Sequence, residues 1–270
     1  MTQDASAQAQ DMARRAAGDR KLHAAARAGF VVSGLMHLLI GWIALQIAFG
    51  GNGKQADQSG ALSELASSSG GRALLWFGVA GFLGLAVWQL VDALLDRPGQ
   101  SNEEKLSKAK SLAKGLVYAA LAVTTFQYAR GGGGTSSSRQ SQDFTASLLQ
   151  APGGRVLVVV LGLVVIAVGG YHVTKGATKR FRTDLSGNPG TVVERLAMAG
   201  YIAKGVALGV VGLLFVVAGL QKDAAKASGL DGALKTLRGQ PFGTPLLCVV
   251  ALGIIAYGLY SFARAKYARL

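Results

Sequence analysis

Residues 28–41, AGFVVSGLMHLLIG, recur in altered form as AGYIAKGVALGVVG at residues 199–212. The two stretches share the spacing of three glycines, which are Gly29, Gly34 and Gly41 in the first and Gly200, Gly205 and Gly212 in the second. A third version, KSLAKGLVYAALA at residues 110–122, keeps Gly115 and has Ala122 in place of the last glycine. In lipid, small residues let helix backbones approach closely. The repeated stretch therefore predicts helices that pack through their glycine faces.

Six stretches of the chain are long and apolar enough to cross a bilayer. A crossing needs about 20 mostly apolar residues, and the runs lie at 28–49, 73–95, 112–129, 156–174, 199–220 and 244–263. Nothing in them alternates with the period of two that a half-buried strand needs, and a backbone in lipid must satisfy its own hydrogen bonds. The sequence therefore predicts an all-α polytopic membrane bundle of six transmembrane helices.

Basic residues are unevenly distributed over the segments between these runs. The chain has 28 Lys and Arg against 14 Asp and Glu, and 19 of the 28 lie in the leader, in segments 97–114 and 175–204, and in the tail. The positive-inside rule therefore predicts a multi-pass membrane protein with both termini in the cytoplasm. Anionic lipid is the expected partner of the basic segments. Nucleic acid is not expected, because no aromatic-basic platform accompanies the charge.

The repeat extends through the loops and the closing helices. GALSEL at 60–65 resembles GALKTL at 232–237, FTASLL at 144–149 is a weaker version, and all three are expected near the outer face, the first and last as short helices. Trp88, Tyr171 and Tyr260 occupy equivalent places near the ends of the closing helices. Each copy has two crossings, so the copies run parallel, related by a pseudo-three-fold axis along the membrane normal. The predicted domains are a polar cytoplasmic leader at 1–27 and repeats at 28–96, 108–181 and 195–267.

Taken together, these motifs resemble a bacterial, mainly actinobacterial, membrane protein family, domain of unknown function 1206, in which a two-helix unit occurs three times. The resemblance covers about residues 25–267 and rests on the glycine-spaced opening helix, the Gly-Ala-Leu segment and the aromatic-polar end of the closing helix. It implies the topology and a place in the bacterial cytoplasmic (inner) membrane, and no particular activity. The middle copy departs most from the pattern.

Nine polar or aromatic residues form a candidate intramembrane polar cluster, since ionisable groups in a membrane are costly and often functional. They are His37, Gln89, Asp92, Lys114, Tyr118, Tyr171, His172, Lys204 and Tyr260. One interpretation is a cytoplasmic vestibule in which the two histidines serve proton or substrate movement. The other is that lysines snorkel, aromatic rings form an interfacial belt, and His37 and Asp92 bond between helices. The second is favoured, because all of them except His37 lie within reach of the boundary.

The sequence contains no recognisable catalytic constellation. H-E-x-x-H, G-x-S-x-G and paired intramembrane carboxylates are all missing, and the single cysteine, Cys248, excludes a cysteine-based metal site. We therefore expect no enzyme activity, no cofactor and no metal. The favoured function is a structural or accessory membrane protein that binds lipid or other membrane proteins.

The alternative function is a small transporter or channel with its path along the pseudo-three-fold axis. The aliphatic stretches 156–165 and 206–217 argue against it, because transport needs polar groups that replace hydration. A path would also require that His37, Gln46, Gln89 and Gln127 share one cavity.

Overall fold

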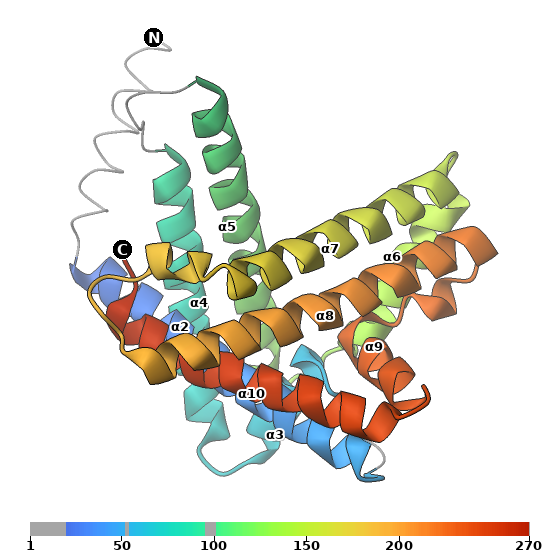
Figure 1. The fold of residues 1–270 in the computed structure, drawn as a ribbon, viewed down its shortest axis with the longest axis horizontal. Coiled ribbons are helices and arrows are strands. Elements are labelled where there is room, and N and C mark those ends of the chain that lie inside the picture. Colours follow the sequence, from blue (N-terminus) through green and yellow to red (C-terminus); the bar gives the residue numbers. More distant parts are fainter. Residues whose placement is uncertain (1–19, 52–53, 95–100, 270) are drawn as a thin grey trace. The chain divides into compact units, whose positions relative to one another are not determined.

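The computed structural model describes residues 20–51, 54–94 and 101–269, and the elements in that part of the chain are all helices (Figure 1). The long helices are α2 (Arg20–Ala48), α4 (Gly71–Leu94), α5 (Ser101–Ala129), α7 (Gly154–Ala177), α8 (Thr191–Gln221) and α10 (Gly243–Tyr267). Between the long helices of each copy lie the short helices α3 (Gln58–Ser67), α6 (Ser137–Gln150) and α9 (Gly229–Arg238). Two 3₁₀ turns, η1 (Arg180–Asp184) and η2 (Ala224–Lys226), complete the set.

The all-α prediction is confirmed, but the count of six crossings is not matched. Five helices in the described part are long and apolar enough to cross a membrane, namely α4, α7, α8, α10 and the part of α2 at Ala26–Ala48. Helix α5 is not among them. The run predicted there, 112–129, contains Lys114, Thr124 and Gln127, and these side chains lower its hydropathy. Most of the predicted leader, residues 1–19, lies outside the described residues.

The chain divides into two compact units. Unit 1 comprises Met1–Val32, Leu65–Gly132 and Arg264–Leu270, and so contains α4 and α5. Unit 2 comprises Ser33–Glu64 and Gly133–Ala263, and so contains α6 to α9 with most of α2, α3 and α10.

Helices α7 and α8 of unit 2 pack closely through glycines. A Cβ added at Gly205 would lie 2.5 Å from the carbonyl oxygen of Gly169, and one at Gly212 would lie 2.6 Å from that of Gly162. Real Cβ atoms do not approach a carbonyl oxygen so closely, so only glycine fits at these positions. This is the close backbone approach that small residues permit between membrane helices.

The same contact recurs where α10 meets α2 and where α4 meets α5. Gly34 occupies the position of Gly205 in the first copy, and a Cβ there would lie 2.9 Å from the oxygen of Gly258. Gly115 occupies it in the second copy, and a Cβ there would lie 3.5 Å from the oxygen of Ala86. The partners Ala86, Gly169 and Gly258 each precede by two the equivalent aromatic residues Trp88, Tyr171 and Tyr260. Positions that are equivalent in the sequence repeat therefore also make equivalent contacts between helices.

In unit 2, hydrogen bonds connect the N-terminal ends of the short helices α3, α6 and α9. Ser59 and Asp231, which immediately precede the two Gly-Ala-Leu segments, each accept a backbone N–H from the next copy. The Ser137 N–H donates to Ser59 Oγ at 3.0 Å, and the Ala56 N–H donates to Asp231 Oδ1 at 2.9 Å. Both acceptors are buried, so these bonds are shielded from competition by water. We call this end of unit 2 the loop end.

Candidate functional site

Five of the nine residues predicted from the sequence gather in unit 2 around an aromatic cluster, which we define as Phe181, Tyr201, Tyr257 and Tyr260. The Tyr201 ring is central. Its centroid lies 5.8 Å from Phe181 in a stacked geometry, 5.2 Å from Tyr257 and 5.7 Å from Tyr260. Such offset and edge-on pairs are the favoured aromatic geometries. Helices α8 and α10 and turn η1 supply the cluster, and His37, Tyr171, His172 and Lys204 contact it or its neighbours.

His37 joins α2 to this cluster. Its Nδ1 lies 2.7 Å from the carbonyl oxygen of Ser33, which can only accept, so Nδ1 carries the hydrogen. Nε2 is then free to accept, and Lys204 Nζ lies 3.5 Å from it. The same ammonium lies 4.3 Å from the centre of the Tyr257 ring, within cation–π range. Lys204 is thus held by a histidine and a tyrosine, both within unit 2.

His172 has a similar local arrangement one helix away. Its Nδ1 donates to the carbonyl oxygen of Val168 at 2.8 Å, and its ring lies 5.8 Å from that of Tyr201. Lys175, one turn further on, pairs with Asp184 at 2.6 Å and lies 5.3 Å from the centre of the Tyr201 ring. The Tyr201 ring is therefore in contact with one cation, Lys175, and with several aromatic rings.

The acidic residues of turn η1 and of the start of α8 are already in ion pairs with basic residues. The buried Phe181 ring fixes η1 against the aromatic cluster. The buried Glu194 pairs with Arg182 and, at 3.6 Å, with Lys179. Two further exposed arginines, Arg180 and Arg195, have no acidic partner among the described residues. We call Lys179, Arg180, Arg182 and Arg195 the basic end of unit 2.

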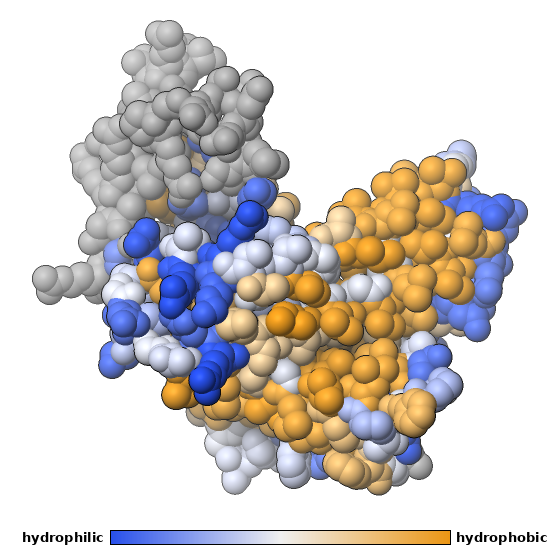
Figure 2. Space-filling view, viewed as in Figure 1, coloured by the Kyte–Doolittle hydropathy of each residue, from blue (hydrophilic) through white to orange (hydrophobic). Residues whose placement is uncertain are grey.

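An exposed apolar stripe on α7 leads to this basic end. It consists of side chains at helical spacing, which are Val156, Val160, Leu163, Val164, Val168 and Tyr171. Figure 2 shows hydrophobic residues along α7 and hydrophilic ones where α7 passes into η1. Only a small part of this helix is buried within the structure. A surface of this kind suits acyl chains along the stripe, with an aromatic ring and then cations at head-group level.

The other four predicted residues belong to unit 1. Asp92 accepts a hydrogen bond from Ser111 Oγ at 2.6 Å, and the Tyr118 ring stacks on Phe82 with centroids 6.4 Å apart. Lys114 is exposed and Gln89 half-buried. Five of the nine residues therefore belong to unit 2 and four to unit 1.

Three polar contacts occupy equivalent positions at the ends of the closing helices. Asp92, Lys175 and Arg264 each follow the equivalent aromatic residue by four. Their partners on the opening helices are also equivalent, and are Ser111, Tyr201 and Phe30. One of these three equivalent contacts is a hydrogen bond from a hydroxyl to a carboxylate. The other two place a cation over an aromatic ring.

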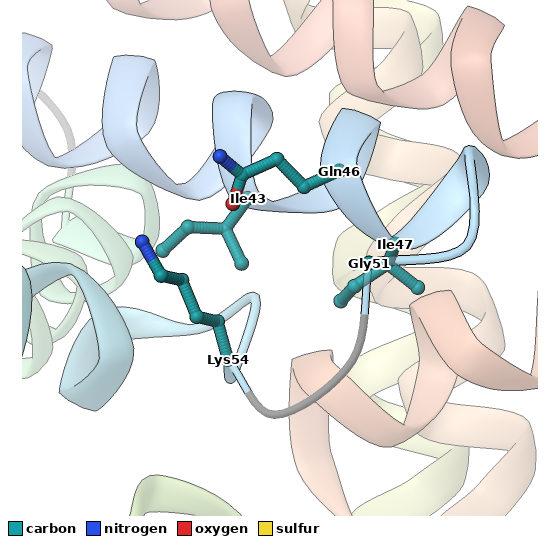
Figure 3. Close-up of a pocket in the computed structure, with 5 residues that line it drawn as sticks. All are labelled: Ile43, Gln46, Ile47, Gly51 and Lys54. Carbon is teal, nitrogen blue, oxygen red and sulfur yellow. The ribbon is translucent and has the colours of Figure 1, made fainter.

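A shallow pocket of about 250 Å³ lies at the C-terminal end of α2 (Figure 3). It is lined by Ile43, Gln46, Ile47, Gly51 and Lys54. His37 is not part of the lining, and Gln127 is an exposed residue of unit 1. His37 and Gln46, both in unit 2, therefore face different surroundings. Within residues 20–51, 54–94 and 101–269, no three His, Cys, Asp or Glu side chains group in a way that would hold a metal ion.

Sequence reasoning missed Phe181, Tyr257 and the acceptors Ser59 and Asp231. Phe181 lies just beyond the predicted helix, where the repeat gives no guidance. Tyr257 matches Leu85 in the first copy, so the alignment marks it as ordinary core. Ser59 and Asp231 could have been found, because both directly precede a Gly-Ala-Leu segment, and Ser and Asp are preferred at helix starts.

Comparison with known proteins gives a family and one relative of similar length. A family model described as Domain of Unknown Function (DUF1206) matches three times, at residues 28–96, 109–179 and 199–268. An uncharacterised protein of Bacillus subtilis (strain 168) is 29% identical over 250 residues, which is 89% of each chain. No solved structure matches the chain. The three matches confirm the threefold repeat found in the sequence.

Proposed function

The chain belongs to the DUF1206 family, whose description assigns no activity, and from that premise and the geometry we propose that it is an accessory membrane protein that binds anionic phospholipid. The observation that carries the proposal is the continuity between the apolar stripe of α7 and the basic end. The stripe would contact acyl chains. Arg180 and Arg195, which no acid of the described chain neutralises, would contact the phosphate.

The placement of the basic residues favours a phosphate over a carboxylate partner from the same chain. Asp184 and Glu194 are already bound by Lys175 and by Arg182 with Lys179. A guanidinium presents two parallel donors that match a phosphate. Each cation near an anionic membrane surface contributes about 1 kcal/mol to lipid attraction. Two unneutralised arginines therefore suffice to enrich anionic lipid over neutral lipid.

The orientation in the membrane is part of the proposal. We place the basic end and both termini in the cytoplasm of a bacterial inner membrane, because the basic residues concentrate on that side. In a Cys248→Ala background, a cysteine at Ser6 should react only with a membrane-permeant thiol reagent. A cysteine at Arg139, which is exposed on α6, should react with an impermeant reagent added outside whole cells. The reverse pattern would contradict the orientation.

The test of lipid binding compares two charge-matched double variants in nanodiscs that contain phosphatidylglycerol and phosphatidylcholine. Native mass spectrometry measures which lipid stays bound. Arg180→Gln with Arg195→Gln should weaken retention of phosphatidylglycerol by about 30-fold, since two cations are worth about 2 kcal/mol. Lys222→Gln with Lys226→Gln, which removes two exposed cations elsewhere in unit 2, should leave it unchanged. Equal retention by both double variants would reject the proposal.

The contact between Lys204 and His37 supports a second candidate, a proton or ion path. A histidine inside a membrane helix is a common element of proton relays, and this one meets a cation at 3.5 Å. If His37 only bridges helices, His37→Leu should cost little stability, because one interhelical hydrogen bond in lipid averages about 0.6 kcal/mol. We expect that structural outcome. Proton flux in wild-type proteoliposomes that His37→Leu abolishes without loss of thermal stability would favour the transporter instead.

A further inference from the structure

The residue directly before each closing helix has a positive φ in all three copies. The angle is +87° for Gly70, +72° for Gly153 and +59° for Phe242. The three residues are equivalent, because each lies 18 positions before Trp88, Tyr171 or Tyr260. Two copies thus use glycine, which adopts this conformation freely, and the third uses a bulky aromatic residue.

Phe242 is not needed for packing. Its residue is 86% exposed, so the side chain has almost no contact with the rest of the structure. A bulky residue with positive φ is a true outlier, and backbone strain of this kind concentrates at functional positions. An exposed aromatic ring at a strained position, where glycine serves in two sister copies, requires a benefit from outside the chain.

The position of Phe242 identifies what lies around it. Helices α2 and α10 are antiparallel neighbours, because Gly34 lies against Gly258 and Gly41 against Ala251. That register brings Phe49, which is 78% exposed, level with the start of α10. Phe49 directly follows one membrane-spanning segment, Ala26–Ala48, and Phe242 directly precedes another, Gly243–Tyr267. Phe49 and Phe242 therefore stand at the same end of the α2–α10 pair, each next to the end of a segment long enough and apolar enough to cross a membrane.

We propose that Phe242 and Phe49 form a paired anchor that inserts into the lipid interface at the loop end. The exposed apolar side chains of α10 that face lipid, Leu246, Val249 and Leu252, continue directly up to Phe242. The anchor is an extension of that lipid-facing surface, so its partner is the bilayer and not a protein. Burying an aromatic ring at the interface offsets the strain of its backbone. The anchor does not depend on the lipid site at the basic end.

The test measures the depth of position 242 in vesicles of phosphatidylglycerol and phosphatidylcholine. In a Cys248→Ala background, Phe242→Cys carries a small environment-sensitive fluorophore. We expect strong quenching by spin labels near the lipid head group, weaker quenching by labels deep in the acyl chain, and little by iodide in water. The reference is Thr236→Cys on the exposed face of α9, which iodide should quench. Iodide quenching at 242 equal to that at 236, or protection from all three quenchers, would overturn the proposal.

Two more variants keep the test decisive if Phe242→Cys folds poorly. Phe49→Cys should show the same shallow quenching, and position 49 does not have the positive φ of position 242. Phe242→Gly should unfold at an equal or higher temperature in detergent, because it removes strain and almost no packing. A lower unfolding temperature for Phe242→Gly would mean that the ring packs against the protein, and would also overturn the proposal.

Discussion

The contact between α7 and α8 and the contact between α4 and α5 are two versions of one interface. In the first, a Cβ at Gly205 would lie 2.5 Å from a backbone oxygen, and in the second, a Cβ at Gly115 would lie 3.5 Å from one. The partner residue is Gly169 in the first and Ala86 in the second. The extra methyl group holds the second pair of helices further apart. A shared register is therefore compatible with quite different closeness of packing.

The polar contacts at the ends of the same two interfaces differ in charge. Lys175 and the Tyr201 ring meet beside the exposed cations of the basic end. The equivalent Asp92 bonds Ser111, and its carboxylate would repel a lipid phosphate. The copies thus share the register of their helix contacts and differ in the chemistry at the helix ends. This difference is why we propose a lipid site at the basic end beside α7 and α8 and not beside α4 and α5.

The largest effect is expected where the interface is closest. Gly205→Ala should lower the free energy of unfolding by about 2–3 kcal/mol, the upper part of the range for overpacking, because the new methyl group meets the backbone of Gly169 and Val173. Thermal unfolding in detergent measures it. Gly209→Ala, one turn away with no atom within 4 Å of its Cβ, is the control and should not destabilise. Equal losses for both variants would show that glycine spacing does not control packing.

A smaller effect is expected for Gly34→Ala, where α2 meets α10. The new Cβ would lie 2.9 Å from the oxygen of Gly258, but its other neighbours are atoms of the Phe262 side chain, which can move. We expect a loss of about 1 kcal/mol, at the lower end of the same range. A loss larger than that of Gly205→Ala in the same unfolding assay would reverse the order of the two interfaces.

A polar contact should matter less than either glycine. Ser111→Ala removes the hydroxyl that donates to Asp92 at 2.6 Å, and hydrogen bonds between membrane helices are worth about 0.6 kcal/mol. A double-mutant cycle with Asp92→Asn measures the coupling. If the coupling energy exceeds that of the glycine substitutions, the bond and not the register positions α5 against α4.

The smallest effect is expected for Gly115→Ala. At 3.4 Å from Gln89 Cβ and 3.5 Å from the oxygen of Ala86, the added methyl group makes ordinary contacts. Alanine also favours helix more than glycine, by about 1 kcal/mol. The unfolding temperature should therefore stay the same or rise slightly. A marked drop would show that the α4–α5 interface is as close as the α7–α8 interface.

The sequence predicted the helices and the contact register better than it predicted the site. Glycine spacing identified Gly34, Gly115 and Gly205 as equivalents because close packing in lipid demands small residues at fixed intervals. The candidate residues were selected by depth along each helix, and depth does not say which helices are neighbours. Hence His37 and Lys204 meet in unit 2 while Asp92 and Tyr118 belong to unit 1. Loop residues such as Phe181 follow no periodic pattern, so nothing in the sequence marked them.

The most direct test of the account is a map of where anionic lipid contacts the chain. A photoactivatable phosphatidylglycerol, cross-linked to the protein in nanodiscs and located by peptide mass spectrometry, should label mainly residues 171–204. Labelling should fall in Arg180→Gln with Arg195→Gln and persist in Lys222→Gln with Lys226→Gln. Equal labelling of residues 86–118 and 171–204, unchanged in the first double variant, would contradict the proposed lipid site at the basic end beside α7 and α8.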